Sequence, residues 1–269
     1  MNLSISPGKN NVGAYINDIN LKSLDQDQAT EIKKILNKYG VIFIKEQNLD
    51  PETYQNFAKN IGQPVVYPRL KGLDEKFPFI NVIERKPDDK NLSFGSSWLH
   101  QDTSYLANDR PRYTMLMGIE IPVGQGNTIF SSGFNAYDKL PDDIKQKIKD
   151  ATGIFSSAGP IAVTRLEREK EMGIKSSESM EAEHPIVITV DGKKTLYVSP
   201  GHLMKIKNVK EGEAEYLKNY LVDHVNKEEF IFSYEWTKGD ICLWDNLSIL
   251  HMASEIKNCR RVMHRITIK

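Results

Sequence analysis

The 269-residue chain has few cysteines, no excess of either charge and no long apolar run. Its two cysteines, Cys242 and Cys259, form no C-x-x-C pair, so we expect reduced thiols in the cytoplasm rather than a disulfide framework. Lys and Arg together number 36, as do Asp and Glu. This balance argues against a nucleic-acid or anionic-membrane binder, for which a basic excess is expected. No run approaches the roughly 18 apolar residues of a membrane-spanning helix. We therefore expect a globular protein with no nucleic-acid and no membrane partner.

Hydrophobic periodicity and turn residues predict many short strands and a few helices. Gly40 suits the end of a first helix, and the order Asp50-Pro51 is typical of a helix start. The expected helices cover residues 25–39, 51–61, 141–148 and 213–225. The expected strands cover residues 41–44, 114–120, 127–132, 186–190, 195–198, 230–232, 240–244 and 261–268.

This order of elements contains no strict βαβ alternation and no internal repeat, which favours a mainly β fold with helices. We expect a double-stranded β-helix (jelly roll) core with helical decoration, as a single domain over residues 1–269. The stretch from Arg165 to Glu183 is highly charged and has no sustained period. Long irregular insertions are usually functional or disordered, which predicts a possible lid at about 160–184.

A candidate metal site is indicated by His100 and Asp102, the only His-x-Asp in the chain. In an extended strand, side chains at positions i and i+2 leave on the same face, so an imidazole and a carboxylate would lie side by side. A second imidazole from far along the chain would complete the two-histidine, one-carboxylate face that holds iron(II) and leaves coordination positions open. Zinc accepts the same donors and also keeps a position open for water.

The last expected strand carries a second signal. Arg261, Met263 and Arg265 would share one face of a regular strand. Burying two guanidiniums without partners would be very costly, so both arginines need anions. A planar guanidinium meets a carboxylate through two parallel hydrogen bonds. The strand therefore indicates a pocket for anionic groups.

Four motifs follow one another in an order that is specific as a set. They are His100-x-Asp102, Gly126 to Gly133, Trp244 to His251, and Arg260 to Arg265. Together they resemble the iron(II)/2-oxoglutarate-dependent dioxygenases of the taurine dioxygenase family, and the likeness runs over nearly the whole chain. The resemblance implies an enzyme that uses Fe(II), 2-oxoglutarate and O2 to hydroxylate a C–H bond, with succinate and CO2 as products.

The resemblance also implies roles for individual residues. His100, Asp102 and His251 would be the catalytic metal ligands. The remaining histidines lack the matching context and are expected elsewhere: His184, His202, His224 and His264.

Thr128 and Arg261 match the positions that bind the distal carboxylate of 2-oxoglutarate. Arg265 matches the position that meets the anionic group of a small organic substrate. Three further residues are candidates for substrate binding: Tyr67, Ser96 and Thr103.

The sequence departs from the taurine enzyme at two of its substrate positions. Pro64 stands where that enzyme has a histidine, and Ser96 replaces an asparagine. A different sulfonate, a carboxylate or a sulfate ester is therefore as admissible as taurine. Two other functions also remain open, namely a zinc-dependent hydrolase on the same ligands and a non-catalytic jelly-roll binding protein. Assembly into a homo-oligomer is common among relatives and is possible for this chain.

Overall fold

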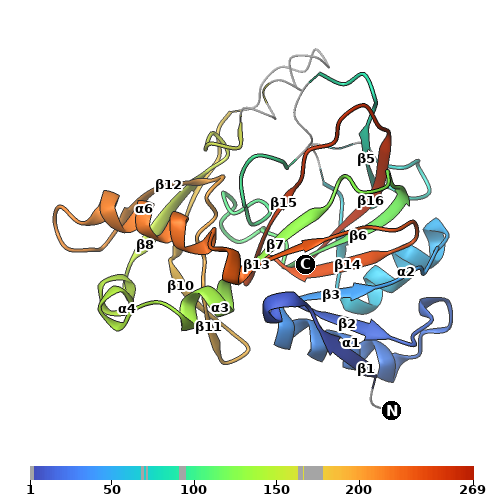
Figure 1. The fold of residues 1–269 in the computed structure, drawn as a ribbon, viewed down its shortest axis with the longest axis horizontal. Helices are drawn as coiled ribbons and strands as arrows, with labels where there is room; N and C mark the ends of the chain where they lie inside the picture. The colour runs from blue at the N-terminus through green and yellow to red at the C-terminus, as the bar shows by residue number, and fades with distance from the viewer. Residues whose placement is uncertain (1–2, 68–69, 71, 91–94, 163–165, 167–177) are drawn as a thin grey trace.

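The computed structural model describes residues 3–67, 70, 72–90, 95–162, 166 and 178–269 (Figure 1). Its α-helices are α1 (Gln26–Tyr39), α2 (Pro51–Ile61), α3 (Gly133–Asp138), α4 (Asp142–Ile148) and α6 (Ala214–Val225). Short 3-10 helices cover Lys9–Asn11, Leu21–Ser23 and Glu228–Phe230.

The strands in the first half of the chain are β1 (Ser4–Pro7), β2 (Ala14–Asn17), β3 (Val41–Ile44), β4 (Pro64–Val65), β5 (Asn81–Arg85), β6 (Tyr113–Glu120) and β7 (Thr128–Ser132). Those in the second half are β8 (Thr152–Ser156), β9 (Glu181–Pro185), β10 (Val187–Val190), β11 (Lys193–Leu196), β12 (Leu203–Lys207), β13 (Ile231–Tyr234), β14 (Ile241–Asp245), β15 (Ile249–Ala253) and β16 (Arg261–Ile268).

Two sheets packed face to face form the centre of the fold. The larger has the order β1-β2-β3-β14-β6-β16-β4, with β5 also paired to β16, and the smaller has the order β13-β7-β15. Phe130 on the smaller sheet packs against Phe43 and Trp244 on the larger one, with ring centroids 5.7 and 5.5 Å away. This arrangement is the jelly roll that the sequence predicts. A β12-β8-β9 sheet, the β10-β11 hairpin and helices α3, α4 and α6 extend from one side (Figure 1).

Each face of the larger sheet has its own core. Helices α1 and α2 cover the outer face, where Ile266 and Ile268 of β16 join their buried cluster. The inner face looks toward the smaller sheet and carries Met263 of the same strand in a separate cluster. Because side chains alternate along a strand, the arginines beside Met263 also point inward, between the sheets.

Local sequence signals explain several element boundaries. The Asp25 carboxylate accepts a hydrogen bond from the Gln28 backbone N–H (2.7 Å) and so caps α1, which is followed by Gly40 at a φ of +77°. The Asp50 carboxylate caps α2 through the Thr53 N–H (2.9 Å), and proline occupies the first turn. These two helices and strand β3 confirm the expectations for the first sixty residues.

Two expectations about the path of the chain need correction. The segment from His100 to Asp102 is not a strand, since His100 makes only an isolated bridge to His251 and Asp102 opens a turn. The left-handed backbone of Thr103, with φ of +49°, breaks the extended course immediately after the carboxylate.

The strands predicted around residues 114–120 and 127–132 both form, but they belong to different sheets, so the turn between them crosses from one layer to the other. Short helix α3 and strands β1, β2, β4, β5, β8, β9, β12 and β15 were not expected, because most are too short or too polar to show a clear period.

The possible lid at about 160–184 falls mostly outside the described residues, since 163–165 and 167–177 are not among them. Its end is not irregular, because residues from Glu181 onward form β9, paired with β8. The lid and the single domain over residues 1–269 stay predictions. Within the part of the chain that is described, no helix is long and apolar enough to cross a membrane.

Candidate metal and co-substrate site

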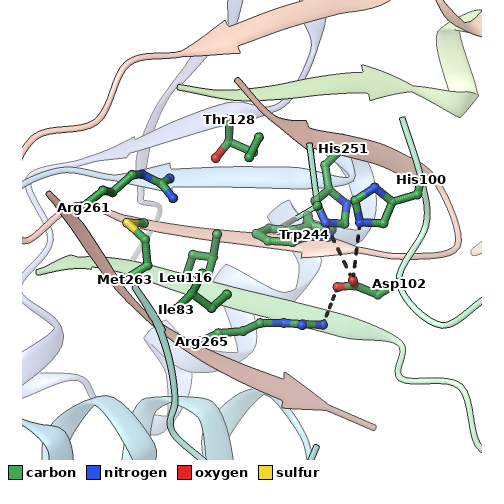
Figure 2. Close-up of a pocket in the computed structure, with 12 residues that line it drawn as sticks. Ile83, His100, Asp102, Leu116, Thr128, Trp244, His251, Arg261, Met263 and Arg265 are labelled. Carbon is green, nitrogen blue, oxygen red and sulfur yellow. Dashed lines mark ion pairs between the residues drawn. The ribbon is translucent and has the colours of Figure 1, made fainter. Parts of the chain in front are cut away.

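A pocket between the two sheets collects residues from six strands and from the loop before Asp102 (Figure 2). Strands β5, β6, β14 and β16 of the larger sheet line one side, β7 and β15 of the smaller sheet line the other, and the remaining lining residues come from the segment 95–102. The lining residues are Ile83, Gly95, His100, Asp102, Leu116, Thr128, Trp244, His251, Ala253, Arg261, Met263 and Arg265.

Three potential metal ligands meet at one end of this pocket. His100, Asp102 and His251 are all buried, and their donor atoms lie within 4.8 Å of one another. Nε2 of His100 is 3.9 Å from Oδ1 of Asp102, and Nε2 of His251 is 3.8 Å from the same oxygen. Among the described residues this is the one group of three or more such side chains with metal-binding spacing. The expected convergence of these distant residues is present.

Backbone hydrogen bonds hold the two histidines together. The His100 N–H donates to the His251 carbonyl at 3.0 Å, and the His251 N–H donates to the His100 carbonyl at 2.9 Å. This reciprocal pair ties the loop carrying the first ligand to β15. The imidazole of His251 also packs on Trp244, with ring centroids 4.5 Å apart. Both rings are thereby held beside the carboxylate.

The protonation states suit a cation. Burial lowers the pKa of both His100 and His251, so both imidazoles are neutral at neutral pH. Nδ1 of His100 lies 3.0 Å from the Trp98 carbonyl, which leaves the lone pair on Nε2 to face Asp102. Burial opposes ionisation of Asp102, but the Arg265 guanidinium foremost, with the hydrogen bond from Thr114, holds the pKa of Asp102 well below its usual value. A lone pair on Nε2 of His100 that faces a carboxylate oxygen without a proton between them fits a bound metal ion.

Arg261 lies at the other end of the pocket, near Thr128 (Figure 2). The side chain is 6% exposed, and its Nε and Nη2 have no hydrogen-bond partner among the described residues. Burial lowers the pKa of Arg261 to about 10. Gly126 leaves room for the Arg261 side chain, because a Cβ at position 126 would stand only 2.8 Å from Cδ of Arg261. A buried guanidinium without a counter-ion fits an anionic ligand.

Thr128 is prepared to donate to the same ligand. Its Oγ1 accepts a hydrogen bond from Nε1 of Trp236 at 3.0 Å. Because a hydroxyl carries one proton and can accept as well, Thr128 keeps its own proton for another acceptor. The structure thus brings Thr128 and Arg261 to one pocket end, as the sequence predicts.

The sequence suggests that Arg265 binds the substrate anion, but in the structure its guanidinium is already paired with a carboxylate. Its Nη2 is 2.9 Å from Oδ2 of Asp102, and its guanidinium lies over the Tyr67 ring, 4.8 Å from the centroid. Arg265 therefore already has a counter-ion in the absence of any ligand. An incoming substrate anion would have to share or displace that contact.

The other predicted substrate residues lie beside the pocket without lining it. Tyr67 contacts the lining residue Arg265 but does not line the pocket itself. Ser96 is buried and forms an isolated β-bridge with Ala253, and its neighbour Gly95 lines the pocket instead. Thr103 is buried, and its Oγ1 has no hydrogen-bond partner in the described structure. Their roles in substrate binding stay predictions.

Sequence reasoning missed several residues around the ligands. Thr114 donates to Oδ2 of Asp102, and Trp244 supports His251. The tryptophan belongs to a motif that the sequence singles out, but nothing in the local sequence of Thr114 indicates its role. The other histidines lie outside the ligand group, as expected: His184, His202, His224 and His264.

These features define a class of protein. A jelly roll holding two imidazoles and one carboxylate on one side of a pocket, with an arginine on the other that no described side chain pairs with, is arranged for a metal ion and an anionic co-substrate. The model of the "Taurine catabolism dioxygenase TauD, TfdA family" matches residues 4–267, and the chain belongs to this family.

Individual relatives agree with this assignment. The chain is 30% identical to an alkylsulfatase of Acinetobacter baylyi, covering 96% of this chain and 82% of the relative. It is 27% identical to an alpha-ketoglutarate-dependent sulfate ester dioxygenase of Pseudomonas putida, covering 100% and 90%. The crystal structure of a taurine dioxygenase from Burkholderia xenovorans has the same fold, with a TM-score of 0.81, 24% identity and coverage of 100% and 91%.

Family membership makes the chain a 2-oxoglutarate-dependent dioxygenase, whose reaction requires Fe(II), 2-oxoglutarate and O2. It favours this activity over the zinc-dependent hydrolase and the non-catalytic binding protein.

Proposed function

We propose that this enzyme oxidises a C–H bond of a small anionic substrate, with a sulfate ester as the first candidate. Two relatives named for sulfate ester chemistry, at 30% and 27% identity, support this choice. A sulfonate or a carboxylate is the second candidate. The observation that carries the proposal is the buried guanidinium of Arg261, which has no counter-ion within the described ranges and lies across the pocket from the ligand group.

In this proposal His100, Asp102 and His251 hold iron(II), which supplies oxygen activation when it is bound. Arg261 and Thr128 bind the distal carboxylate of 2-oxoglutarate, so the co-substrate spans the pocket with its 2-oxo acid end toward the ligand group. Between the two arginines, Ile83, Leu116 and Met263 form an apolar wall (Figure 2). That wall suits the hydrocarbon part of the co-substrate and keeps water away.

Arg265 would orient the substrate by its anionic group, with the Tyr67 ring supporting the guanidinium. For a sulfate ester, the reacting carbon is the one that bears the ester oxygen. Hydroxylation replaces its C–H bond by C–OH. The C–O bond to sulfate then breaks, giving an aldehyde and inorganic sulfate, while 2-oxoglutarate becomes succinate and CO2.

The remaining expectations form part of the same proposal. They are a single catalytic domain, a cytoplasmic location, the absence of nucleic-acid and membrane partners, and assembly as a possible homo-oligomer.

A substrate panel tests the proposed class. Alkyl sulfates, alkyl sulfonates and carboxylates of matched chain length are supplied with Fe(II), 2-oxoglutarate and O2, and succinate release is measured for each. We expect the sulfate esters to give the highest kcat/KM, with free sulfate formed in step with succinate. Succinate release by carboxylates alone would contradict the sulfate ester.

A second experiment tests the site. Anaerobic addition of Fe(II) and 2-oxoglutarate should give a weak visible charge-transfer band, which His100→Ala, Asp102→Ala and Arg261→Ala should abolish. Activity restored by zinc, without that band, would instead favour the hydrolase.

A further inference from the structure

The two oxygens of Asp102 have different surroundings. Oδ1 faces both imidazoles, at 3.9 Å from Nε2 of His100 and 3.8 Å from Nε2 of His251. Oδ2 points away from them. It accepts a hydrogen bond of 2.6 Å from Oγ1 of Thr114 and lies 2.9 Å from Nη2 of Arg265. Oδ1 is therefore available to a metal ion, whereas Oδ2 already interacts with Thr114 and Arg265.

The hydrogen bond from Thr114 has a fixed direction. Nδ2 of Asn246 donates to Oγ1 of Thr114 at 2.9 Å. An amide NH₂ can only donate, and an ionised carboxylate can only accept, so the single hydroxyl proton of Thr114 must point at Asp102.

The amide of Asn246 is itself oriented by two donors. Its Oδ1 accepts from Nε1 of Trp244 at 3.0 Å and from the backbone N–H of Asp102 at 3.4 Å. These bonds fix which end of the amide is oxygen. Trp244, Asn246, Thr114 and Asp102 therefore form a closed, buried chain of hydrogen bonds in which every member has its partner.

Arg265 has two tasks if it also binds the substrate anion, because that anion would share or displace its contact with Oδ2. Thr114 has no such second task, since it is fully buried on β6 and does not line the pocket. When a substrate draws the guanidinium away, the Thr114 hydroxyl is the donor that stays on the carboxylate.

We infer that Thr114, held by Asn246, is a positioning residue. Its hydroxyl keeps Oδ2 of Asp102 hydrogen-bonded to the protein, so that only Oδ1 is available to the metal. This inference rests on the proposed function. A carboxylate restricted to one donor atom occupies one coordination position instead of two, which leaves room for a chelating co-substrate and for oxygen.

Mn(II) binding to the metal-free full-length protein tests the inference without turnover. The dissociation constant is measured from the EPR signal of free Mn(II). Thr114→Val keeps the shape of the side chain but removes the donor, and loss of such an outer partner typically weakens metal binding by about 10–100-fold. Thr114→Ser restores the hydroxyl and should bind within about threefold of wild type, well inside that range.

Thr267 provides a matched control. It stands directly opposite Thr114 in the β6–β16 register, is 1% exposed, and its Oγ1 has no hydrogen-bond partner among the described residues. Thr267→Val removes a buried hydroxyl from the same wall of the sheet without touching Asp102. Its Mn(II) affinity should equal that of wild type.

Several outcomes would overturn the inference. Thr114→Val that binds Mn(II) as tightly as Thr267→Val, or Thr114→Ser that binds as weakly as Thr114→Val, would show that the hydroxyl does not position the carboxylate. If Thr114→Val does not fold by circular dichroism, Thr114→Ala takes its place with the same expectation. Wild-type protein that binds Mn(II) no better than His251→Ala would instead contradict the proposed metal site itself.

Discussion

Replacing Arg261 by methionine should have opposite effects on the ligand-free and the liganded protein. Without ligand, the buried guanidinium has no counter-ion among the described residues, and burial lowers its pKa from 12.5 to about 10. Each pKa unit corresponds to about 1.4 kcal/mol, so the buried charge costs roughly 3 kcal/mol. Methionine has a similar length and no charge. The free energy of unfolding of ligand-free Arg261→Met should therefore exceed that of wild type by roughly 1–3 kcal/mol.

The order should reverse when 2-oxoglutarate binds. A ligand at 100 times its dissociation constant stabilises the folded state by about 2.7 kcal/mol. Wild type should show this gain in the presence of Mn(II) and 2-oxoglutarate. Arg261→Met has lost the partner of the distal carboxylate and should gain much less. Urea unfolding followed by circular dichroism, first with a chelator and then with Mn(II) and 2-oxoglutarate, measures both quantities.

Arg260→Met is the matched control, because Arg260 is the exposed neighbour and pairs with Glu84 and Glu120 on the surface. Exposed ion pairs contribute about 0–1 kcal/mol, so this variant should be slightly destabilised and should keep the full response to 2-oxoglutarate. The reasoning is refuted if ligand-free Arg261→Met is less stable than Arg260→Met, or if 2-oxoglutarate stabilises both variants equally.

Two further predictions concern neighbouring residues. Gly126→Ala would place a Cβ 2.8 Å from Cδ of Arg261 at a φ of +75°. The dissociation constant of 2-oxoglutarate, measured by calorimetry with Mn(II), should then rise about tenfold, or about 1.4 kcal/mol. Gly124→Ala has a φ of +69° but nothing within 4 Å, and an equal loss there would assign the effect to backbone strain. Burial raises the pKa of Asp245 to about 6. The folded state thus binds more protons than the unfolded state between about pH 4 and 6, and stability falls as the pH rises through this window. Relative to Asp245→Asn, wild type should lose up to about 3 kcal/mol from pH 4 to pH 7 in urea unfolding, and a constant difference would contradict this reasoning.

Much of the architecture was predictable because its signals are local. The caps of α1 and α2 and the Asp-Gly turn between β10 and β11 each depend on a few adjacent residues. The inward face of β16 followed from simple alternation, and Met263 lies there as expected. Strands such as β8, β9 and β12 escaped prediction because their stability comes from pairing with one another and not from their own composition.

The sequence alone determined which residues are the candidates for the metal and anion site. The spacing of His100 and Asp102, the distant His251 and the paired arginines, together with the order of their motifs, indicate the metal and anion site. These are properties of residue type and order, which the printed sequence contains in full.

Only the tertiary structure decided how those residues meet. It placed Thr114 of β6 on one oxygen of Asp102, paired Arg265 with that oxygen, and left Nε and Nη2 of Arg261 without a hydrogen-bond partner in the described part of the chain. Each of these facts depends on which strands lie side by side and on how much water the packing excludes. The direction of the Thr114 hydrogen bond is set by Asn246, 132 positions away, and no local pattern encodes that contact or the exclusion of water.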